Sequence, residues 1–280
     1  MSRTSPTLRR RRLARELRQR RLKAGISVDK AARAAGVAKS TLQRWEATES
    51  SVQLSAVALL LRFYGADEAE IDTLSEVARD ARRRGWWLPW NDVIPSWAVT
   101  YIGLESEAAE VMEFQPLLVP GLLQTEGYAE AIFRAAHPDE SDEHIKRRVE
   151  LRMLRQQRED DVKLSVVIGE GALRIPVGGS DVMRLQHQRL IEVANEGRYN
   201  LHVLPATARE HASMMCGFIM LRFREPVDVP LVYLEAQAVS LYLEEEADIE
   251  HYASLYEHLS AVALSVRDSV RMISEIAETI

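Results

Sequence analysis

The stretch that decides the fold of the N-terminal part is residues 17–46, LRQRRLKAGISVDKAARAAGVAKSTLQRWE. Small and apolar side chains recur in it, and just before it, at the three- and four-residue spacing of a helix face; they are Leu13, Leu17, Ala24, Val28, Ala31, Ala32 and Ala35. Gly25 and Gly36 each follow one of these runs, and glycine is strongly favoured just beyond the end of a helix. The sequence predicts a helix over 13–24 and a second one from Ser27, whose hydroxyl can cap it, to just before Gly36.

A third helix is predicted after the short turn at Val37. Leu42 and Trp45 fall on its inner side, whereas its outer side carries polar side chains that can bond to base edges or phosphates; these are Lys39, Ser40, Gln43 and Arg44. Two short helices joined across a glycine turn, the second with a polar and cationic outer face, indicate a helix-turn-helix. A solvated helix face is the alternative. Amphipathic patterns over 54–64 and 71–81 add two helices, so five helices can close a small core.

Two charged residues fall on inner faces of this module. Arg21 lies on the buried stripe of the first helix and Glu46 on the buried side of the third. Because a charge is rarely buried alone, we expect Arg21 and Glu46 to form an ion pair. Ala38 stands where a capping hydroxyl is usual, and its absence costs the third helix about 1 kcal/mol unless Ser40 or the preceding turn compensates.

The net charge of −6 is distributed unevenly along the chain. Residues 1–64 hold 15 Lys and Arg against 4 Asp and Glu, which is +11, so residues 65–280 carry −17. A compact basic module is suited to neutralising phosphates, and the acidic remainder should repel nucleic acid. The basic run within residues 3–12 leaves two interpretations open, a disordered solvated arm or a further phosphate-contacting segment.

The N-terminal residues resemble the helix-turn-helix of phage-repressor-type (XRE-like) regulators. The resemblance rests on Leu17-Arg18, Arg21, Gly25-Ile26-Ser27, Ala31-Ala32, Gly36-Val37, Ser40, Leu42, Arg44 and Glu46. The contacts that it implies are base contacts from Lys39, Ser40 and Arg44, and phosphate contacts from Thr41 and from the start of the second helix at Ser27. It also implies the pairing of Arg21 with Glu46. The family's frequent Asn-Gly after this glutamate is Ala47-Thr48 here, so one phosphate contact is lost or relocated.

A tryptophan-rich segment follows the basic module. Four of the five tryptophans lie close together with two prolines, at Trp86, Trp87, Trp90 and Trp97. This composition predicts a non-helical connector that is held by aromatic burial, with an aromatic ligand cage as the alternative. We therefore divide the chain into a DNA-binding domain over 1–84, a connector over 85–100 and a C-terminal domain over 101–280.

The C-terminal domain mixes helix and strand patterns. Alternating apolar residues from Val162 to Ile168 predict a strand. Further strands are expected over 201–204, 218–223 and 231–235, and helices over 104–114, 126–136, 142–158, from about 180 to 194, and from 248 to the C-terminus. The predicted fold is thus an α-helical N-terminal domain of about five helices followed by an α+β domain with a small sheet and a long C-terminal helical region.

The C-terminal region resembles the Scr-type antitoxin-like domain of unassigned function. The resemblance rests on Trp86-Trp87, Glu105, Ala108, Val119 to Thr125, Tyr128-Ala129, Arg152, Arg155-Gln156, Glu170, Leu173-Arg174, Gly178-Gly179, Gln186, Leu204-Pro205, Phe218, Tyr233, Glu235, Ala263 to Ser265 and Ser269. Gly169 and Gly171 flank Glu170 where that family more often has an acidic residue and Ala. The resemblance implies an actinobacterial transcriptional regulator of the kind often encoded beside a small acidic partner protein, and it supplies no ligand.

The segment from Pro120 to Thr125 leaves two interpretations open. Pro-Gly favours a type II turn, and Gln124 and Thr125 can cap the helix that follows, which makes a structural corner. The other interpretation is the wall of a ligand or partner pocket, whose residues would be Gly121, Leu122, Gln124, Thr125, Tyr128, Arg152 and Gln156.

The sequence indicates no catalytic, cofactor or metal site. His211, Ser213 and Cys216 lack a placed acid. His251 and His258 share a helix face, with Asp248 three residues before the first, and are more typical of a surface or core pair than of a metal site. The single cysteine, Cys216, is expected to be a small buried apolar residue. We expect no enzyme activity and no cofactor. No apolar run reaches the roughly 18 to 20 residues of a membrane span, so the expected location is the cytoplasm, at the nucleoid.

These features predict a sequence-specific regulator that binds double-stranded DNA as a homodimer, because one small helix-turn-helix makes few base contacts. The C-terminal domain would sense a ligand or a small partner protein. The alternative is an antitoxin-like or scaffold protein whose main role is to hold a small acidic partner, with DNA binding as autoregulation. An enzyme fused to a DNA anchor is a third, disfavoured interpretation.

Overall fold

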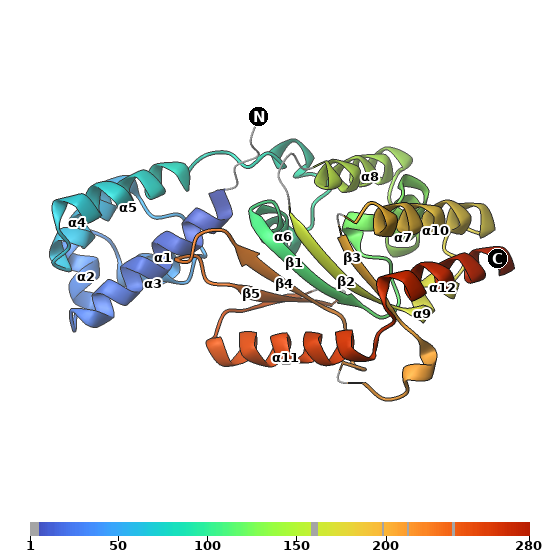
Figure 1. Cartoon of the computed structure of the whole chain (residues 1–280). Helices are drawn as coiled ribbons and strands as arrows, with labels where there is room; N and C mark the ends of the chain where they lie inside the picture. Colours follow the sequence, from blue (N-terminus) through green and yellow to red (C-terminus); the bar gives the residue numbers. More distant parts are fainter. Residues whose placement is uncertain (1–5, 158–161, 198, 212, 237–238) are drawn as a thin grey trace. The chain divides into compact units, whose positions relative to one another are not determined.

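The computed structural model describes residues 6–157, 162–197, 199–211, 213–236 and 239–280. The chain forms two compact units, Met1–Leu88 and Pro89–Ile280, which we treat separately (Figure 1). The helix elements of the N-terminal unit are α1 (Pro6–Lys23), α2 (Val28–Ala34), α3 (Lys39–Glu46), α4 (Leu54–Phe63) and α5 (Glu68–Asp80). No helix of the described ranges is long and apolar enough to cross a membrane.

The N-terminal unit contains the five helices that the sequence predicts, around one apolar core. Its largest fully buried side chains come from α1, α3 and α4, namely Leu13, Leu17, Leu42, Leu60 and Leu61. Gly25 and Gly36 adopt positive φ values of 66° and 67°. The N–H of the residue after each glycine closes the helix end: Ile26 donates to the Arg21 carbonyl and Val37 donates to the Ala32 carbonyl, both at 3.0 Å. These are Schellman closures, for which glycine has no Cβ penalty.

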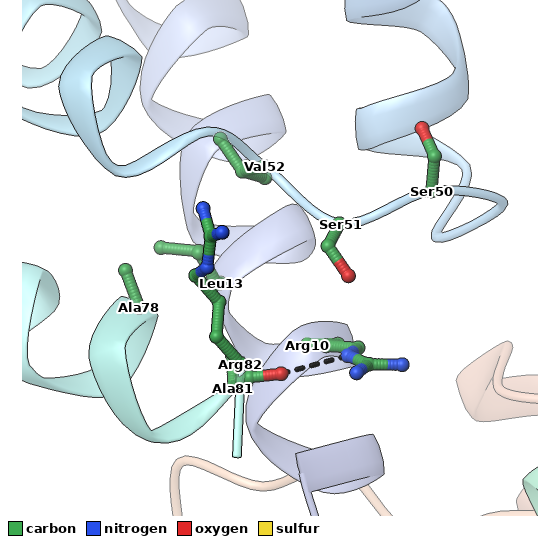
Figure 2. Close-up of a pocket in the computed structure, with 8 residues that line it drawn as sticks. All are labelled: Arg10, Leu13, Ser50, Ser51, Val52, Ala78, Ala81 and Arg82. Atoms are coloured by element: carbon green, nitrogen blue, oxygen red, sulfur yellow. Dashed lines mark hydrogen bonds between the residues drawn. The ribbon is translucent and has the colours of Figure 1, made fainter. Parts of the chain in front are cut away.

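Helix α1 begins at Pro6 instead of near residue 13, so the described part of the basic run is helical. Its start packs against the end of α5, where Arg10 Nε donates to the Ala81 carbonyl at 2.7 Å (Figure 2). Arg9 lies 3.6 Å from the Asp80 carboxylate. The hollow at this junction measures only about 10 Å³, room for about one water molecule. The disordered-arm interpretation is therefore wrong for residues 6–12, and residues 3–5 lie outside the described residues.

The C-terminal unit is a six-stranded mixed sheet with helices on both faces. Its strands are β1 (Ala108–Gln115), β2 (Lys163–Gly169), β3 (Tyr199–Leu204), β4 (Phe218–Phe223), β5 (Leu231–Glu235) and β6 (Ser240–Leu243). Its helices are η1 (Leu88–Trp90), which begins at the last residue of the N-terminal unit, α6 (Ser96–Glu105), η2 (Gly121–Leu123), α7 (Glu126–Ala136), α8 (Asp142–Gln156), α9 (Glu170–Arg174), α10 (Ser180–Asn195), η3 (Ala206–Ala208), α11 (Glu246–Val262) and α12 (Val266–Thr279).

The sheet order is β3-β2-β1-β4-β5-β6, with β1, β2 and β3 parallel and the remaining neighbours antiparallel. Both crossovers between parallel strands run through helices and step in the same direction, so their helices cover the same face, as expected for right-handed connections. Helix α11 covers the other face with Tyr256 and Leu259, against Phe114, Phe218 and Met220 (Figure 1). Successive side chains of a strand point to opposite faces of the sheet. Glu113, which precedes Phe114 on β1, therefore points to the face covered by α6, α7 and α8.

Two sequence expectations for this unit were wrong. Residues 104–114 were expected to be helical, but β1 occupies most of them. Ala108, Val111 and Phe114 follow the spacing of a helix face, and the strand register shifts between Ala108 and Glu110. The connector expected to be non-helical contains α6 from Ser96 onward. The expected C-terminal helical region is present as two helices, since the chain turns at residues 263–265 and Ser265 caps α12.

The strands expected over 201–204, 218–223 and 231–235 are present as β3, β4 and β5, and that from Val162 as β2. The helix expected over 142–158 is α8, and residue 158 lies outside the described residues. Cys216 was expected to be buried but is exposed, because it lies in the loop that enters β4.

Candidate functional site

The helix-turn-helix is built by α2 and α3. Ser27 caps α2, its Oγ accepting from the Lys30 N–H at 3.4 Å. Leu42 and Trp45 of α3 are buried at 0% and 2% exposure, which fixes the rotation of the helix about its axis. The opposite side of α3 is therefore turned to solvent, and it exposes Lys39, Ser40, Gln43 and Arg44, with Thr41 half-buried.

A buried ion pair ties α1 to α3. Arg21, only 6% exposed, donates from Nε and Nη2 to the two Glu46 carboxylate oxygens at 2.6 and 2.8 Å. Its Nη1 donates to the Ile26 carbonyl at 2.9 Å, in the turn before α2. This is the pairing expected from the spacing of the two residues. A fork-like guanidinium that joins α1, the turn and α3 holds the recognition helix in one orientation.

Two local features of α3 depart from an ideal recognition helix. Ala38 occupies the N-cap position, and no side chain accepts a hydrogen bond there. After the helix, Thr48 adopts φ 59°, a left-handed conformation that disfavours β-branched residues. The chain thus turns tightly after α3, with backbone strain at Thr48.

One predicted base-contacting residue already has a protein partner. Lys39 Nζ lies 2.9 Å from Asp29 Oδ2 of α2, with both side chains about half exposed. Such a solvent-exposed pair is weak, so a phosphate or base oxygen can replace the carboxylate. Arg44 is exposed and, within the described ranges, makes no ion pair.

The C-terminal unit holds a cavity of about 910 Å³ between the sheet and the helices α6, α7 and α8. Gly121, Gln124 and Arg152, from the pocket set expected from the sequence, line it. Tyr128 and Gln156 serve instead to hold the segment 119–125. The Tyr128 hydroxyl accepts from the Val119 N–H at 3.1 Å, and Gln156 Nε2 donates to the carbonyls of Gly121 and Gln124 at 3.0 and 2.8 Å.

The segment 120–125 is a corner as well as a wall. Leu122 is buried, and Thr125 caps α7 by accepting from the Tyr128 N–H. Gln186 of α10 is fully buried and makes three hydrogen bonds to the segment. Its Oε1 accepts from the Thr125 N–H at 2.7 Å and from the Thr125 hydroxyl at 3.3 Å, and its Nε2 donates to the Leu123 carbonyl at 2.9 Å. Gly121 begins the η2 turn and lacks the positive φ of a type II turn, so that expectation was wrong. A Cβ there would lie 3.1 Å from Arg152 Nη1, so a larger residue at this position would displace the guanidinium slightly.

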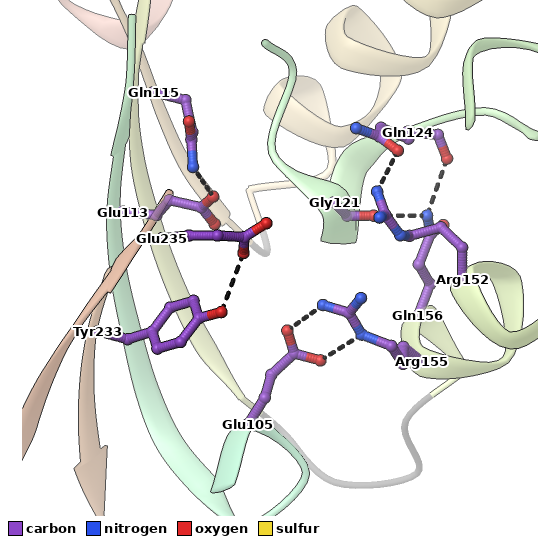
Figure 3. A network of polar contacts seen from close by, with 10 residues as sticks. All are labelled: Glu105, Glu113, Gln115, Gly121, Gln124, Arg152, Arg155, Gln156, Tyr233 and Glu235. Atoms are coloured by element: carbon purple, nitrogen blue, oxygen red, sulfur yellow. Dashed lines mark hydrogen bonds and ion pairs between the residues drawn. The ribbon is translucent and has the colours of Figure 1, made fainter. Parts of the chain in front are cut away.

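Charged residues that the sequence-derived set did not include line the cavity or contact its lining. Arg155 lines it, and its Nε donates at 2.9 Å to the carboxylate of Glu105, which is 2% exposed and lies behind the lining (Figure 3). Glu113 is 3% exposed and accepts from Gln115 Nε2 at 2.9 Å. Burial raises the pKa of Glu113 to about 7. Glu105 and Arg155 were among the residues of the C-terminal resemblance, whereas no sequence signal distinguished Glu113.

Aromatic rings complete the cavity wall. Tyr101 and Tyr233 stack with ring centroids 4.3 Å apart, and the Arg155 guanidinium lies 5.5 Å from the Tyr101 ring centroid. Trp97 and Phe133 also line the cavity. Of the four clustered tryptophans, Trp86 and Trp87 lie in the N-terminal unit and Trp90 and Trp97 in the C-terminal unit.

Two protein families match the chain. A helix-turn-helix domain matches residues 12–74, and a domain of unknown function (DUF5753) matches residues 99–275, more than half of the chain. The chain belongs to the DUF5753 family. No curated protein and no solved structure matches it. The helix-turn-helix match indicates DNA binding and transcription regulation. The DUF5753 match covers most of the residues that line the cavity, and residues 93–98 of the lining precede it.

In the DUF5753 domain, the cavity lies against the β1, β4 and β5 side of the sheet. Its acidic residues come from β1 and β5, its aromatic residues from these strands, α6 and α7, and its guanidinium groups from α8. The domain therefore presents opposite charges from opposite walls, which is the chemistry from which its role is inferred below.

Proposed function

We propose that the protein is a sequence-specific transcription regulator of the XRE-like type, whose recognition helix is α3. The observation that carries the proposal is the exposed polar face of α3, Lys39, Ser40, Gln43 and Arg44, on a helix fixed by the Arg21 and Glu46 pair. Arginine can donate two hydrogen bonds to guanine and glutamine can pair with adenine in the major groove. Thr41 and Ser27 are then placed at the phosphates.

We propose further that it binds DNA as a homodimer. Helix α3 is eight residues long, so one copy contacts only a few base pairs. Two copies that bind half-sites about 10 base pairs apart multiply the affinity and the specificity. Light scattering of the protein alone and with DNA measures this stoichiometry, and one copy per bound site would exclude the dimer.

The experiment that tests DNA recognition is selection of bound sequences from a random DNA pool, followed by binding measurements on the selected site and on scrambled DNA. Arg44→Ala should cost roughly 1 to 3 kcal/mol on the selected site and relax the preference at one base position. Arg62→Ala is the matched control, because Arg62 is an exposed arginine of α4 that is paired with Glu68. Equal losses on both DNAs for Arg44→Ala would exclude it as a base contact.

For the DUF5753 domain we propose ligand sensing. The support is a cavity of small-molecule size with charged groups on facing walls. A scaffold role with a small acidic partner makes a different prediction, since such a partner would co-purify with the chain and alter the selected DNA site. Mapping DNA occupancy in cells with and without the neighbouring small protein distinguishes the two roles.

A further inference from the structure

The floor of the DUF5753 cavity is defined by strand register. Glu113, Ile219 and Tyr233 are partners across β1, β4 and β5. Two residues further along these strands, the corresponding positions are Gln115, Gly217 and Glu235, all of which line the cavity. Gly217 adds no side chain between the two polar groups, and a Cβ there would lie 2.6 Å from the Phe114 carbonyl oxygen and 3.1 Å from Gln115 Oε1. The floor is thus bordered by carboxylate and amide groups.

The sheet wall carries a buried carboxylate that forms no ion pair within the described residues. Glu113 accepts a hydrogen bond from Gln115, and Arg152 and Arg155 of α8 act on it only through their charges, which lower its pKa less than burial raises it. Beside it, the Tyr233 hydroxyl donates to the Glu235 carboxylate at 3.0 Å, at the exposed end of β5. A buried anion without an ionic partner is unfavourable, which is why burial raises the pKa of Glu113.

The helix wall carries the complementary group. Arg152 donates from Nη1 to Gln124 Oε1 and lies over the Phe133 ring at 4.9 Å, while its buried Nε has no acceptor in the described ranges. Burial, with the nearby Arg155 charge, lowers the pKa of Arg152 to about 10. The carboxylate of Glu105 is held by Arg155 and acts on Arg152 only through its charge, which offsets the lowering of the pKa of Arg152 in part.

Figure 3 shows the two groups on opposite sides of the space, Glu113 and Glu235 on the strands and Arg152 on α8. We propose that this cavity binds a small zwitterion, of the amino-acid or dipeptide kind, with its ammonium group at Glu113 and its carboxylate at Arg152. A purely anionic ligand would leave Glu113 without a partner, and a purely cationic one would leave Arg152 without one. The apolar body of the ligand packs against Tyr101, Tyr233 and Phe133, whose rings line the same cavity.

This inference deepens the ligand-sensing part of the proposed function, on which its regulatory meaning rests. Binding itself is measured on the full chain by equilibrium dialysis and mass spectrometry. The first probe is a pool of free amino acids and of free dipeptides that contain Phe, Tyr or Trp. The second pool is N-acetylated and lacks the ammonium group, and the third is C-terminally amidated and lacks the carboxylate. We expect retention of members of the first pool, and at least about tenfold weaker retention of their modified forms.

The variants separate the two ends of the ligand. Glu113→Gln should weaken retention of the free form by about tenfold and leave retention of the N-acetylated form unchanged. Arg152→Met should likewise weaken retention of the free form by about tenfold and leave retention of the amidated form unchanged. Glu110→Gln, on the same strand, is the control because Glu110 does not line the cavity. The modified probes on the unaltered protein keep the test decisive if a variant fails to fold.

Two results would overturn the proposal: no retention from the first pool, or equal retention from all three pools. DNA selection by the same protein preparation is recorded in parallel. Failure of retention with intact DNA selection refutes the ligand proposal alone, and retention without any selected DNA site refutes the DNA-binding proposal alone.

Discussion

The buried carboxylate of Glu113 should make the stability of the protein depend on pH. The pKa of Glu113 is raised from the ordinary 4.5 to about 7, chiefly by burial. Between these pH values the folded protein retains a proton that the unfolded chain has released. The contribution of Glu113 to the free energy of unfolding is therefore highest below pH 4.5. It falls as the pH rises from 4.5 through 7 and stays constant above that. The difference corresponds to about 3 kcal/mol, from 1.36 kcal/mol for each pH unit.

Glu113→Gln removes this dependence, because an amide stays neutral at every pH. The variant should match the parent protein near pH 4.5 and exceed its free energy of unfolding by up to about 3 kcal/mol at pH 8. Urea unfolding followed by circular dichroism at several pH values measures the difference between the two proteins, in which the contributions of all other titrating groups cancel.

Glu110→Gln is the matched control with the opposite sign. The Glu110 carboxylate is partly buried, but hydrogen bonds from Lys163 at 2.6 Å and Arg222 at 3.1 Å outweigh burial and lower its pKa. The stabilisation by the Glu110 carboxylate is present above pH 4.5 and is lost as the pH falls below that value. Glu110→Gln should therefore be less stable than the parent protein throughout pH 5 to 8. A Glu113→Gln variant that is less stable than the parent at pH 8, or whose advantage does not change with pH, would refute the reasoning.

Three further changes probe the N-terminal unit. Arg21→Ala leaves the buried Glu46 carboxylate without its partner and should destabilise the unit by about 3 to 5 kcal/mol, measured by urea unfolding. Thr48→Gly relieves the left-handed strain at φ 59° and should raise the free energy of unfolding by about 1 kcal/mol; a loss would show that the Thr48 side chain contributes more than its strain costs. Ala38→Ser supplies the missing cap and should raise the thermal midpoint by the equivalent of about 1 kcal/mol, and an unchanged midpoint would mean that the α3 start is already satisfied.

The N-terminal unit could be predicted because its determinants are local. Helix ends at Gly25 and Gly36 and the cap at Ser27 each depend on a few adjacent residues, and the inner face of α3 follows from spacing alone. Even the pairing of Arg21 with Glu46 needed only the rule that buried charges are paired. What sequence missed there was the length of α1, because a run of arginines has no apolar pattern by which to detect helix.

The cavity could not be predicted because it depends on strand register and on a wrongly assigned element. With residues 104–114 taken as helix, Glu113 had no reason to be buried, and its alignment with Tyr233 across three strands was invisible. Arg152 was identified through the resemblance, but its relation to Gly121 depends on a corner held by Gln156 and Gln186 from distant helices. Such contacts between residues far apart in the chain leave no periodic signal.

The hydrogen-bond partners of Arg152 differ from those of three other arginines whose side chains are largely buried. Arg21 and Arg148 each direct two N–H groups at one carboxylate, Glu46 and Glu140, and Arg155 does the same with Glu105. Arg152 has only an amide oxygen and a ring, with Nε left over. Each of these three guanidinium groups has a carboxylate within reach, whereas Arg10 of the N-terminal unit donates to a backbone carbonyl. Arg152 differs from all four because it lies in a cavity, opposite a carboxylate that forms no ion pair within the described residues, which argues that its missing partner arrives with a ligand.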